Sequence, residues 1–360
     1  MEINPDRIKR AYADIRTQLS KRIVGQERVV EELVTAFFAG GHCLLMGVPG
    51  LAKTLLIRTF AESLSLKFNR IQFTPDLMPS DITGTDVLAS ESGGTRKFSF
   101  LWGPIYANVV LADEINRTPP KTQSALLEAM EEAQVTVAGQ RYHLPKPFFV
   151  MATQNPIEQE GTYPLPLAAL DRFLFKVQVD YPAYNEELEM LFATTSGGES
   201  KVEQIVAKDD IIEMLDAVRN IAISDEVLTY ATRIVRETRP AQTTFPYIKE
   251  MVEVGGSPRA VQALILGGKA HAAIDGRGEV RASDVRAIAH PALRHRVIPS
   301  FHATADNIRA DDLIDYVLEK VPRPADDVTQ ASPKRQSFSL ARWLLGSPKP
   351  RKKKHTPLKK

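Results

Sequence analysis

A glycine-bearing turn that ends in Lys53 and Thr54 is the first stretch of the sequence with an evident chemical use. An apolar run at residues 43–46 precedes the turn and a helix-forming stretch follows it. In the pattern G-x-x-x-x-G-K-[ST], backbone N–H groups at the helix N-terminus hold phosphates, the lysine reaches the outer phosphates and the hydroxyl binds Mg²⁺. Gly47, Lys53 and Thr54 fit this pattern, whereas Ala52 stands where the second glycine is usual. An ordinary strand, turn and helix is the alternative interpretation.

Two adjacent carboxylates follow a second apolar run. Residues 109–112 are typical of a buried parallel strand, and Asp113 and Glu114 come where its carboxyl end opens on a site. Asp113 would hold Mg²⁺ through water, and Glu114 would orient or deprotonate an attacking water. A solvated strand end is the alternative, and the presence of Lys53 argues against it.

Two further polar residues stand at the ends of predicted elements. Asn155 follows the strand predicted at residues 148–153, where an amide can align the water and touch the γ-phosphate; a plain turn residue before proline is the alternative. Arg259 lies in the first turn of a helix that Ser257 caps and Pro258 opens. An anion can approach there, although a simple helix-end cation is also possible.

The predicted elements place these residues on a parallel α/β sheet that is followed by helices. Strand patterns cover residues 68–73, 109–114, 148–153 and 174–179, and they alternate with helical patterns, as a parallel sheet requires. Two hairpins with glycine turns, at residues 83–100 and 135–144, interrupt this order. Beyond residue 181 the patterns are helical without a clear strand, at residues 186–195, 208–220, 225–238, 260–274 and 282–289. We therefore predict a nucleotide-binding core over residues 1–180, a helical domain over residues 181–322 and a disordered basic tail over residues 323–360.

Charge and cysteine content limit the functional classes. The 360 residues carry a net charge of +2, but residues 325–360 hold ten Lys or Arg against two Asp, which leaves −6 for the rest. The net negative charge of residues 1–324 argues against nucleic-acid binding by that part of the chain, so any such affinity would lie in the tail. The single cysteine, Cys43, excludes an internal disulfide, and the first residues lack a signal-peptide pattern, so a cytoplasmic location is expected.

The tail carries two features of its own. Residues 338–345 can form two apolar helical turns, and residues 349–360 are strongly basic. Docking to a partner, to an anionic membrane surface or to nucleic acid are the functional interpretations, and a solvated tail is the alternative.

With these motifs in order, the chain resembles an AAA+ ATPase of the MoxR group over roughly residues 5–320. The loop sequence Gly-Val-Pro-Gly-Leu-Ala-Lys-Thr is that group's own form, so Ala52 supports the resemblance. The segment at residues 152–156, Ala-Thr-Gln-Asn-Pro, is similar as well. The hairpin at residues 83–100 resembles the helix-2 insert, and the one at residues 135–144 the pre-sensor hairpin, of the clade that includes magnesium chelatase subunits.

The resemblance implies a role for each matching residue. Asn155 looks like sensor 1, Arg172 like the arginine finger presented to a neighbouring subunit, and Arg259 like sensor 2 from a C-terminal helical lid. An ion pair with Asp171 or another surface acid is the alternative interpretation of Arg172. Residues 23–25 would lie by the adenine. The implied nucleotide-binding residues are Ile23, Val24, Gly25, Gly47, Val48, Pro49, Gly50, Leu51, Ala52, Lys53, Thr54 and Leu55, with Thr54 and Asp113 on Mg²⁺.

The function implied is that of an ATP-hydrolysing ring, a hexamer in such proteins, with chaperone-like action on a protein client. For the group this means activation of a partner or insertion of a metal or cofactor, often with a partner that carries a von Willebrand factor A domain. A nucleic-acid motor of the same clade is one alternative, but the second hairpin offers only Arg141 and His143 as cations. A non-hydrolysing, nucleotide-gated scaffold is another, and it would have no need of Glu114.

Overall fold

The structure, a computed structural model, describes residues 5–324 except residues 49, 91–95, 156–160 and 196–200. Residues up to Pro324 form one compact unit. The basic tail that we predicted to be disordered, with its apolar turns at residues 338–345, lies outside the described residues. Among the described helices, none combines the length and the apolar character that a membrane span requires.

A five-stranded parallel sheet forms the centre of the fold, in the order β2-β5-β8-β1-β9. Its strands are β1 (Cys43–Met46), β2 (Phe68–Gln72), β5 (Val109–Asp113), β8 (Phe149–Gln154) and β9 (Phe175–Gln178). The inner strands are nearly continuous apolar runs because both faces of the sheet are covered. All carboxyl ends of the strands therefore meet at one edge of the sheet, and all amino ends at the opposite edge.

Alternate residues of β1, β5 and β8 enter two hydrophobic clusters, one on each face of the sheet. One cluster takes Leu45 and Leu111 and packs them against helices on the side of the N-terminus. The other takes Leu44 and Val110 and packs them against α4 and α5. The core helices are α1 (Pro5–Ser20), α2 (Glu27–Phe38), α3 (Lys53–Ser63), α4 (Pro79–Thr83), α5 (Pro120–Glu132) and α6 (Leu167–Leu170), with a 3₁₀ turn at Ile115–Arg117.

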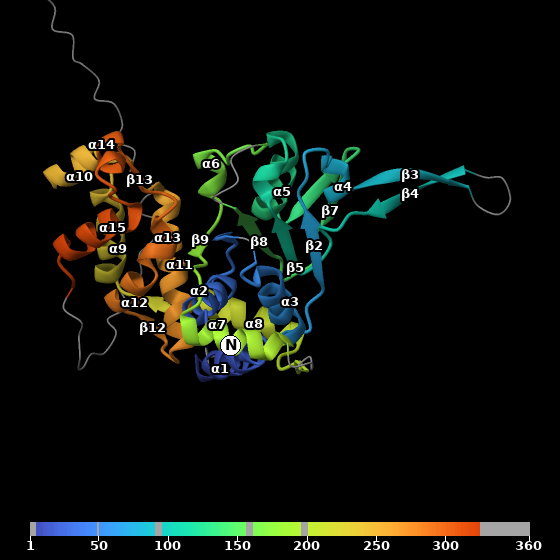
Figure 1. Ribbon diagram of the computed structural model, residues 1–360, viewed down its shortest axis with the longest axis horizontal. Coiled ribbons are helices and arrows are strands. Elements are labelled where there is room, and N and C mark those ends of the chain that lie inside the picture. The colour runs from blue at the N-terminus through green and yellow to red at the C-terminus, as the bar shows by residue number, and fades with distance from the viewer. Residues whose placement is uncertain (1–4, 49, 91–95, 156–160, 196–200, 325–360) are drawn as a thin grey trace, which may run out of the picture. The chain divides into compact units, whose positions relative to one another are not determined.

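Two antiparallel hairpins leave the core as predicted. They are β3 (Gly84–Ser90) with β4 (Arg96–Trp102), and β6 (Gln134–Val137) with β7 (Gln140–His143). The first projects away from the sheet (Figure 1). Their bases are joined by aromatic rings, since Phe100 of β4 stacks on Tyr142 of β7 with ring centroids 4.2 Å apart. Trp102 contacts Tyr142 as well, at 5.6 Å.

The C-terminal part is largely helical, as predicted. Its helices are α7 (Tyr184–Thr195), α8 (Lys208–Arg219), α9 (Asp225–Glu237), α10 (Pro246–Met251), α11 (Pro258–Ile274), α12 (Ala282–Ala287), α13 (Ala289–Leu293), α14 (Phe301–Ala305) and α15 (Ala310–Lys320). The expectation of no strand was wrong, because β10 (Ala222–Ile223) pairs with β12 (Glu279–Val280), and β11 (Val252–Val254) with β13 (Ile298–Pro299). Segments of two or three residues are too short to show a period of two.

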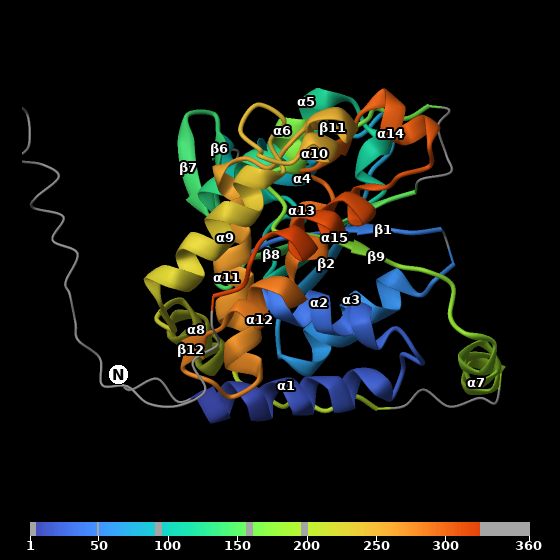
Figure 2. The ribbon, with the colours of Figure 1, turned by 90° about the vertical axis from the view of Figure 1, so that its left-hand side faces the viewer.

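The long helix α11 joins the C-terminal helices to the sheet core. Ser257 caps it as predicted, because its hydroxyl accepts from the backbone N–H of Arg259 at 3.0 Å. Both α11 and α3 pack against α1 (Figure 2). One hydrophobic cluster runs from α1–α3 into α11, α12, α13 and α15, so packing is continuous across residue 180. The division into two domains there stays a prediction.

Candidate functional site

The predicted phosphate loop connects β1 to α3 at the carboxyl edge of the sheet. Gly47 is required by close packing, because a Cβ atom there would lie 2.4 Å from the carbonyl oxygen of Val179. Gly50 and Ala52 both have positive φ angles, of 86° and 52°, and α3 begins directly after them at Lys53. The loop therefore turns sharply and ends at a helix N-terminus. Pro49 lies outside the described residues.

Lys53 is folded back over its own loop. Its ammonium donates to the carbonyl oxygen of Gly47 at 2.5 Å. Burial lowers the pKa of Lys53, and the nearby carboxylates of Asp113 and Glu114 oppose that effect. The lysine thus shares one site with the two carboxylates, as the sequence predicted. Thr54 follows it in the first turn of α3 and is partly buried, whereas Leu55 is exposed.

Asp113 ends β5 and is fixed by two neighbouring strands. On one side Arg70 of β2 donates to its Oδ2 at 2.7 and 3.0 Å. On the other side the hydroxyl of Thr153 in β8 donates to its Oδ1 at 2.6 Å. These hydrogen bonds hold the carboxylate in one orientation, with the cation of Arg70 beside it.

Glu114 adopts a left-handed backbone conformation, with φ at 57°. This conformation is uncommon for a residue other than glycine, and it carries the side chain out of the strand direction. Its Oε2 accepts from Gln72 Nε2 at 2.8 Å and from Arg117 at 3.2 Å. Its backbone N–H donates to the Thr153 hydroxyl at 2.8 Å, so Thr153 fixes both acidic residues.

Asn155 directly follows β8, which lies between β5 and β1 in the sheet. The register pairs Met46 with Gln154 and Ala112 with Ala152. Asn155 therefore leaves the sheet between the phosphate loop and the acidic pair, where the sequence predicted it.

The segment predicted to lie by the adenine runs directly before α2. Gln26 donates to the carbonyl oxygen of Leu51 at 3.3 Å, which links this segment to the phosphate loop. Ile23 and Gly25 line a cavity of about 370 Å³ against α1. Val24 lies between them and is partly buried, and Val48 and Leu51 of the loop are partly buried and buried.

Arg172 and Arg259 lie together at a different place. The guanidinium of Arg172 donates to Glu131 Oε2 at 2.8 Å, and that of Arg259 donates to Glu131 Oε1 at 2.5 Å. All three line a cavity of about 290 Å³, together with Gly41 and His42, which directly precede β1. The ion pair of Arg172 with a surface acid, which we gave as an alternative, is thus present in this chain.

The two groups of residues occupy opposite edges of the sheet. Gly47 follows the carboxyl end of β1, whereas Leu174, two residues after Arg172, hydrogen-bonds to His42 at its amino end. β1 is four residues long, and at about 3.3 Å per residue the two edges are separated by roughly 13 Å. The structure therefore does not bring Arg172 or Arg259 to the phosphate loop of their own chain.

Comparison with known proteins places this arrangement in a family. A model described as "ATPase family associated with various cellular activities (AAA)" matches residues 42–175, and one for the AAA lid domain matches residues 247–317. The chaperone MoxR1 of Mycobacterium tuberculosis is 42% identical over 308 residues, which are 85% of this chain and 81% of that protein. The chain belongs to the MoxR group of AAA+ ATPases.

Two further relatives of this MoxR-group chain agree with that assignment. Protein MoxR of Methylorubrum extorquens is 32% identical over 334 residues, which are 87% of this chain and 95% of that protein. The crystal structure of a candidate ATPase from Cytophaga hutchinsonii superposes with a TM-score of 0.83 at 39% identity, and the match covers 89% of this chain and 97% of that one. The fold predicted from the sequence, a parallel α/β core with a helical lid, is confirmed.

Sequence reasoning missed the residues of this MoxR-group chain that hold the predicted ones in place. They are Arg70, Gln72, Arg117, Thr153 and Glu131. Each is a common polar residue within an element or a turn, and its partner lies on another element for all but Arg117. Thr153 lies within the Ala-Thr-Gln-Asn-Pro segment at residues 152–156, which could have pointed to it, whereas no motif marks the other four.

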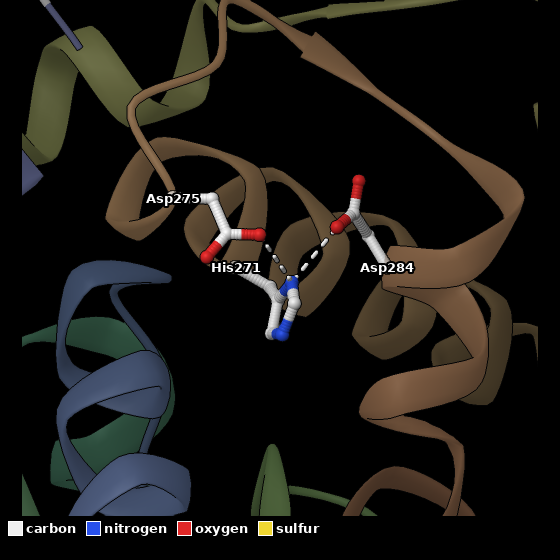
Figure 3. A group of neighbouring side chains, drawn as sticks. All are labelled: His271, Asp275 and Asp284. Atoms are coloured by element: carbon white, nitrogen blue, oxygen red, sulfur yellow. Dashed lines mark hydrogen bonds and ion pairs between the residues drawn. The ribbon is translucent and has the colours of Figure 1, made fainter.

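A separate cluster of potential metal ligands lies in the lid. His271, Asp275 and Asp284 offer ligand atoms within 4.8 Å of one another (Figure 3). Arg277 already donates to both carboxylates, and His271 Nδ1 lies 2.8 Å from Asp284. These contacts satisfy the acids and tie α11 to α12, so we assign the cluster to the structure of the lid.

Proposed function

We propose that the chain hydrolyses ATP with Mg²⁺ at sites shared between adjacent subunits of a ring. The observation that carries this proposal is the placement of the lysine and carboxylates at one edge of the sheet and of Arg172 and Arg259 at the other. A second copy placed head to tail would bring the arginines of one subunit to the phosphate loop of the next. Such a heterologous contact closes into a ring when its rotation allows, and we propose six subunits.

The residues at the carboxyl edge fit a nucleotide with Mg²⁺. The hydroxyl of Thr54 would supply a hard oxygen ligand of the kind that Mg²⁺ takes, and Asp113, whose two oxygens accept from Arg70 and Thr153, would hold the ion through water. When bound, Mg²⁺ neutralises charge on the β- and γ-phosphates. Lys53 exchanges the carbonyl of Gly47 for a phosphate oxygen, which gives its ammonium a stronger, charged acceptor.

We assign the activation of the attacking water to Glu114. Gln72 and Arg117 hold its carboxylate in one orientation, so it is ready to accept the proton of an attacking water. Asn155, at the tip of the adjacent strand, aligns that water and contacts the γ-phosphate.

The arginines of the neighbouring subunit complete the site. A guanidinium is always charged, and it matches the oxygens of a phosphoryl group in a planar fork. Supplied across an interface, such a group contributes on the order of a thousandfold in rate. In this proposal both Arg172 and Arg259 act on the nucleotide of the next subunit.

In this proposal, the mechanical work driven by ATP hydrolysis is done on a protein client. The name of the Mycobacterium tuberculosis relative, a chaperone, supports such a role. We propose that the client or its adaptor carries a von Willebrand factor A domain, as the resemblance to the MoxR group implies, and that the outcome is activation or metal insertion.

The test is ATPase activity per subunit as a function of protein concentration, for wild type and Arg172→Ala. Activity that rises with concentration and falls about a thousandfold in Arg172→Ala is expected. Arg58→Ala, which removes an exposed arginine paired with Glu62 within α3, is the matched control and should behave as wild type. Activity that is independent of concentration and of Arg172 would refute the shared site.

Mixing two inactive variants tests the direction of the contact. Arg172→Ala keeps Glu114, and Glu114→Gln keeps Arg172, so a mixed ring contains interfaces with both intact groups. Partial recovery of activity on mixing is expected. A mixture as inactive as its components, under conditions where mixed rings are detected by mass, would contradict a finger acting between subunits.

A further inference from the structure

Glu131, near the C-terminal end of α5, receives both arginines that the proposed mechanism assigns to the neighbouring subunit. Each carboxylate oxygen takes one guanidinium: Oε2 accepts from Arg172 Nε at 2.8 Å and Oε1 from Arg259 at 2.5 Å. The arginines come from different parts of the fold, since Arg172 follows α6 and Arg259 lies in the first turn of α11. One carboxylate thus brings together a residue of the core and a residue of the lid.

The contact with Glu131 sets the orientation of the guanidinium groups of Arg172 and Arg259. Arg172 also donates through Nη1 to the carbonyl oxygen of Ala168 at 2.9 Å, so two of its three nitrogens are held within the chain. Two guanidinium groups this close repel each other, and a carboxylate between them offsets that repulsion. Without Glu131, the two side chains would separate and lose their common orientation.

The backbones that carry the arginines are joined as well. Asp171 Oδ2 accepts from the hydroxyl of Ser257 at 2.8 Å, and the same hydroxyl accepts from the backbone N–H of Arg259 at 3.0 Å. The other oxygen of Asp171 accepts from the buried Arg296 at 2.7 Å. The two segments therefore meet at a rigid joint, and what remains to be set is the direction of the two long side chains.

We propose that Glu131 is a positioning residue that holds Arg172 and Arg259 as one pair, spaced to receive the terminal phosphate of ATP bound to an adjacent subunit. The inference rests on the proposed function, because it gives that shared site its arrangement. Glu131 itself touches neither the nucleotide nor the attacking water. Glu131 acts by setting the orientation of the two guanidinium groups, which contact the phosphate in this proposal.

The strength of the contact suits this role. The side chains of Arg172, Glu131 and Arg259 are 32%, 42% and 41% exposed, and ion pairs at such exposure are weak. Hydrogen bonds from Arg172 and then Arg259 lower the pKa of Glu131, so the carboxylate stays charged at neutral pH. A phosphate, which carries more negative charge than the Glu131 carboxylate, can therefore bind the outer nitrogens of both arginines while Glu131 keeps them together.

The experiment compares Glu131→Gln with Glu128→Gln at a protein concentration where wild-type activity per subunit has reached its plateau. Glu128 lies one turn earlier on the exposed side of α5, so its variant makes the same change of charge on the same helix. For Glu131→Gln we expect kcat to fall by about tenfold to a hundredfold, because misplacement of a catalytic group by about 1 Å has an effect of that size. The KM for ATP should stay within about twofold, because Lys53 and Thr54 bind the nucleotide at the other edge. Glu128→Gln should match wild type in both.

A shorter carboxylate provides a second measurement. Glu131→Asp keeps the charge but moves it back by one methylene, and its kcat should lie between those of wild type and Glu131→Gln. The pattern of a lowered kcat, an unchanged KM and partial rescue by aspartate is not expected from a role in folding alone.

The inference would be overturned by a kcat of Glu131→Gln equal to or above that of wild type, since Glu131 would then be passive or would restrain the arginines. The activity of Arg172→Ala distinguishes a failure of the shared site from a failure of the role given to Glu131. If Arg172→Ala retains full activity, the shared site itself is wrong; if Arg172→Ala is inactive while Glu131→Gln is fully active, only the role of Glu131 is wrong.

Discussion

Thr153→Val tests whether the acidic pair must be held by the neighbouring strand. The Thr153 hydroxyl is buried, donates to Asp113 at 2.6 Å and accepts from the backbone N–H of Glu114 at 2.8 Å. Valine has nearly the same shape but can make neither contact. Loss of the bond to the carboxylate costs about 1.5–3 kcal/mol, and an unsatisfied buried N–H costs about 1–3 kcal/mol more. Since burial of the new methyl group offsets about 1 kcal/mol, we expect the free energy of unfolding to fall by about 1.5–5 kcal/mol.

The same change should disturb catalysis more than it disturbs folding. With Asp113 and Glu114 released from Thr153, the carboxylates lose their fixed direction, and we expect kcat to fall by about a hundredfold. Urea unfolding measures the first effect and steady-state phosphate release the second. Thr153→Ser, which keeps the hydroxyl and loses one methyl group at a cost of about 1 kcal/mol, is the control. A Thr153→Val protein that hydrolyses ATP as fast as Thr153→Ser would refute this reasoning.

Two further substitutions test the water-activating group and the lid. Glu114→Gln should leave ATP binding, measured by calorimetry, intact while phosphate release falls by about 10²–10⁴-fold, because an amide cannot accept the proton; unchanged release would remove Glu114 from its role. Asp284→Asn should lower the free energy of unfolding at pH 7 by about 3–5 kcal/mol, because Arg277 and His271 lose a buried charged partner. Burial alone would raise the pKa of Asp284, but hydrogen bonds from Arg277 and His271 lower it to about 2, below the usual 3.8. This stabilisation is therefore complete above about pH 4 and is lost as the pH falls through 2, by about 2 kcal/mol, and equal acid sensitivity in wild type and Asp284→Asn would contradict it.

The sequence predicts the central sheet well because its signals are local. Buried parallel strands are apolar runs, and the loop from Gly47 to Thr54 has a pattern tied to one geometry. The same locality accounts for Asp113 and Glu114, which directly follow a run of apolar residues. Those predictions needed no knowledge of which strands are neighbours.

The residues that orient the site depend on such knowledge. Gln72 reaches Glu114 only because β2 pairs with β5, in a register that sets Gln72 beside Asp113. That pairing joins strands far apart in the sequence and leaves no local pattern. Glu131 was missed for the same reason, since one of its partners, Arg259, lies in a helix more than one hundred residues later.

The lid attaches to the core at the amino ends of the strands, and β9 connects this attachment to the phosphate loop at their carboxyl ends. Arg296 of the lid donates to the carbonyl oxygens of Phe173 and Leu174, at 2.7 and 3.0 Å, directly before β9. At the far end of the same strand, the carbonyl of Val179 packs against Gly47 of the phosphate loop. We therefore expect movement of the lid against the core to act on β9 and, through Val179, on the surroundings of the loop. Because the lid also carries Arg259, a phosphate in the adjacent subunit of the proposed ring would pull on the element that contacts the phosphate loop, which would connect successive sites of that ring physically.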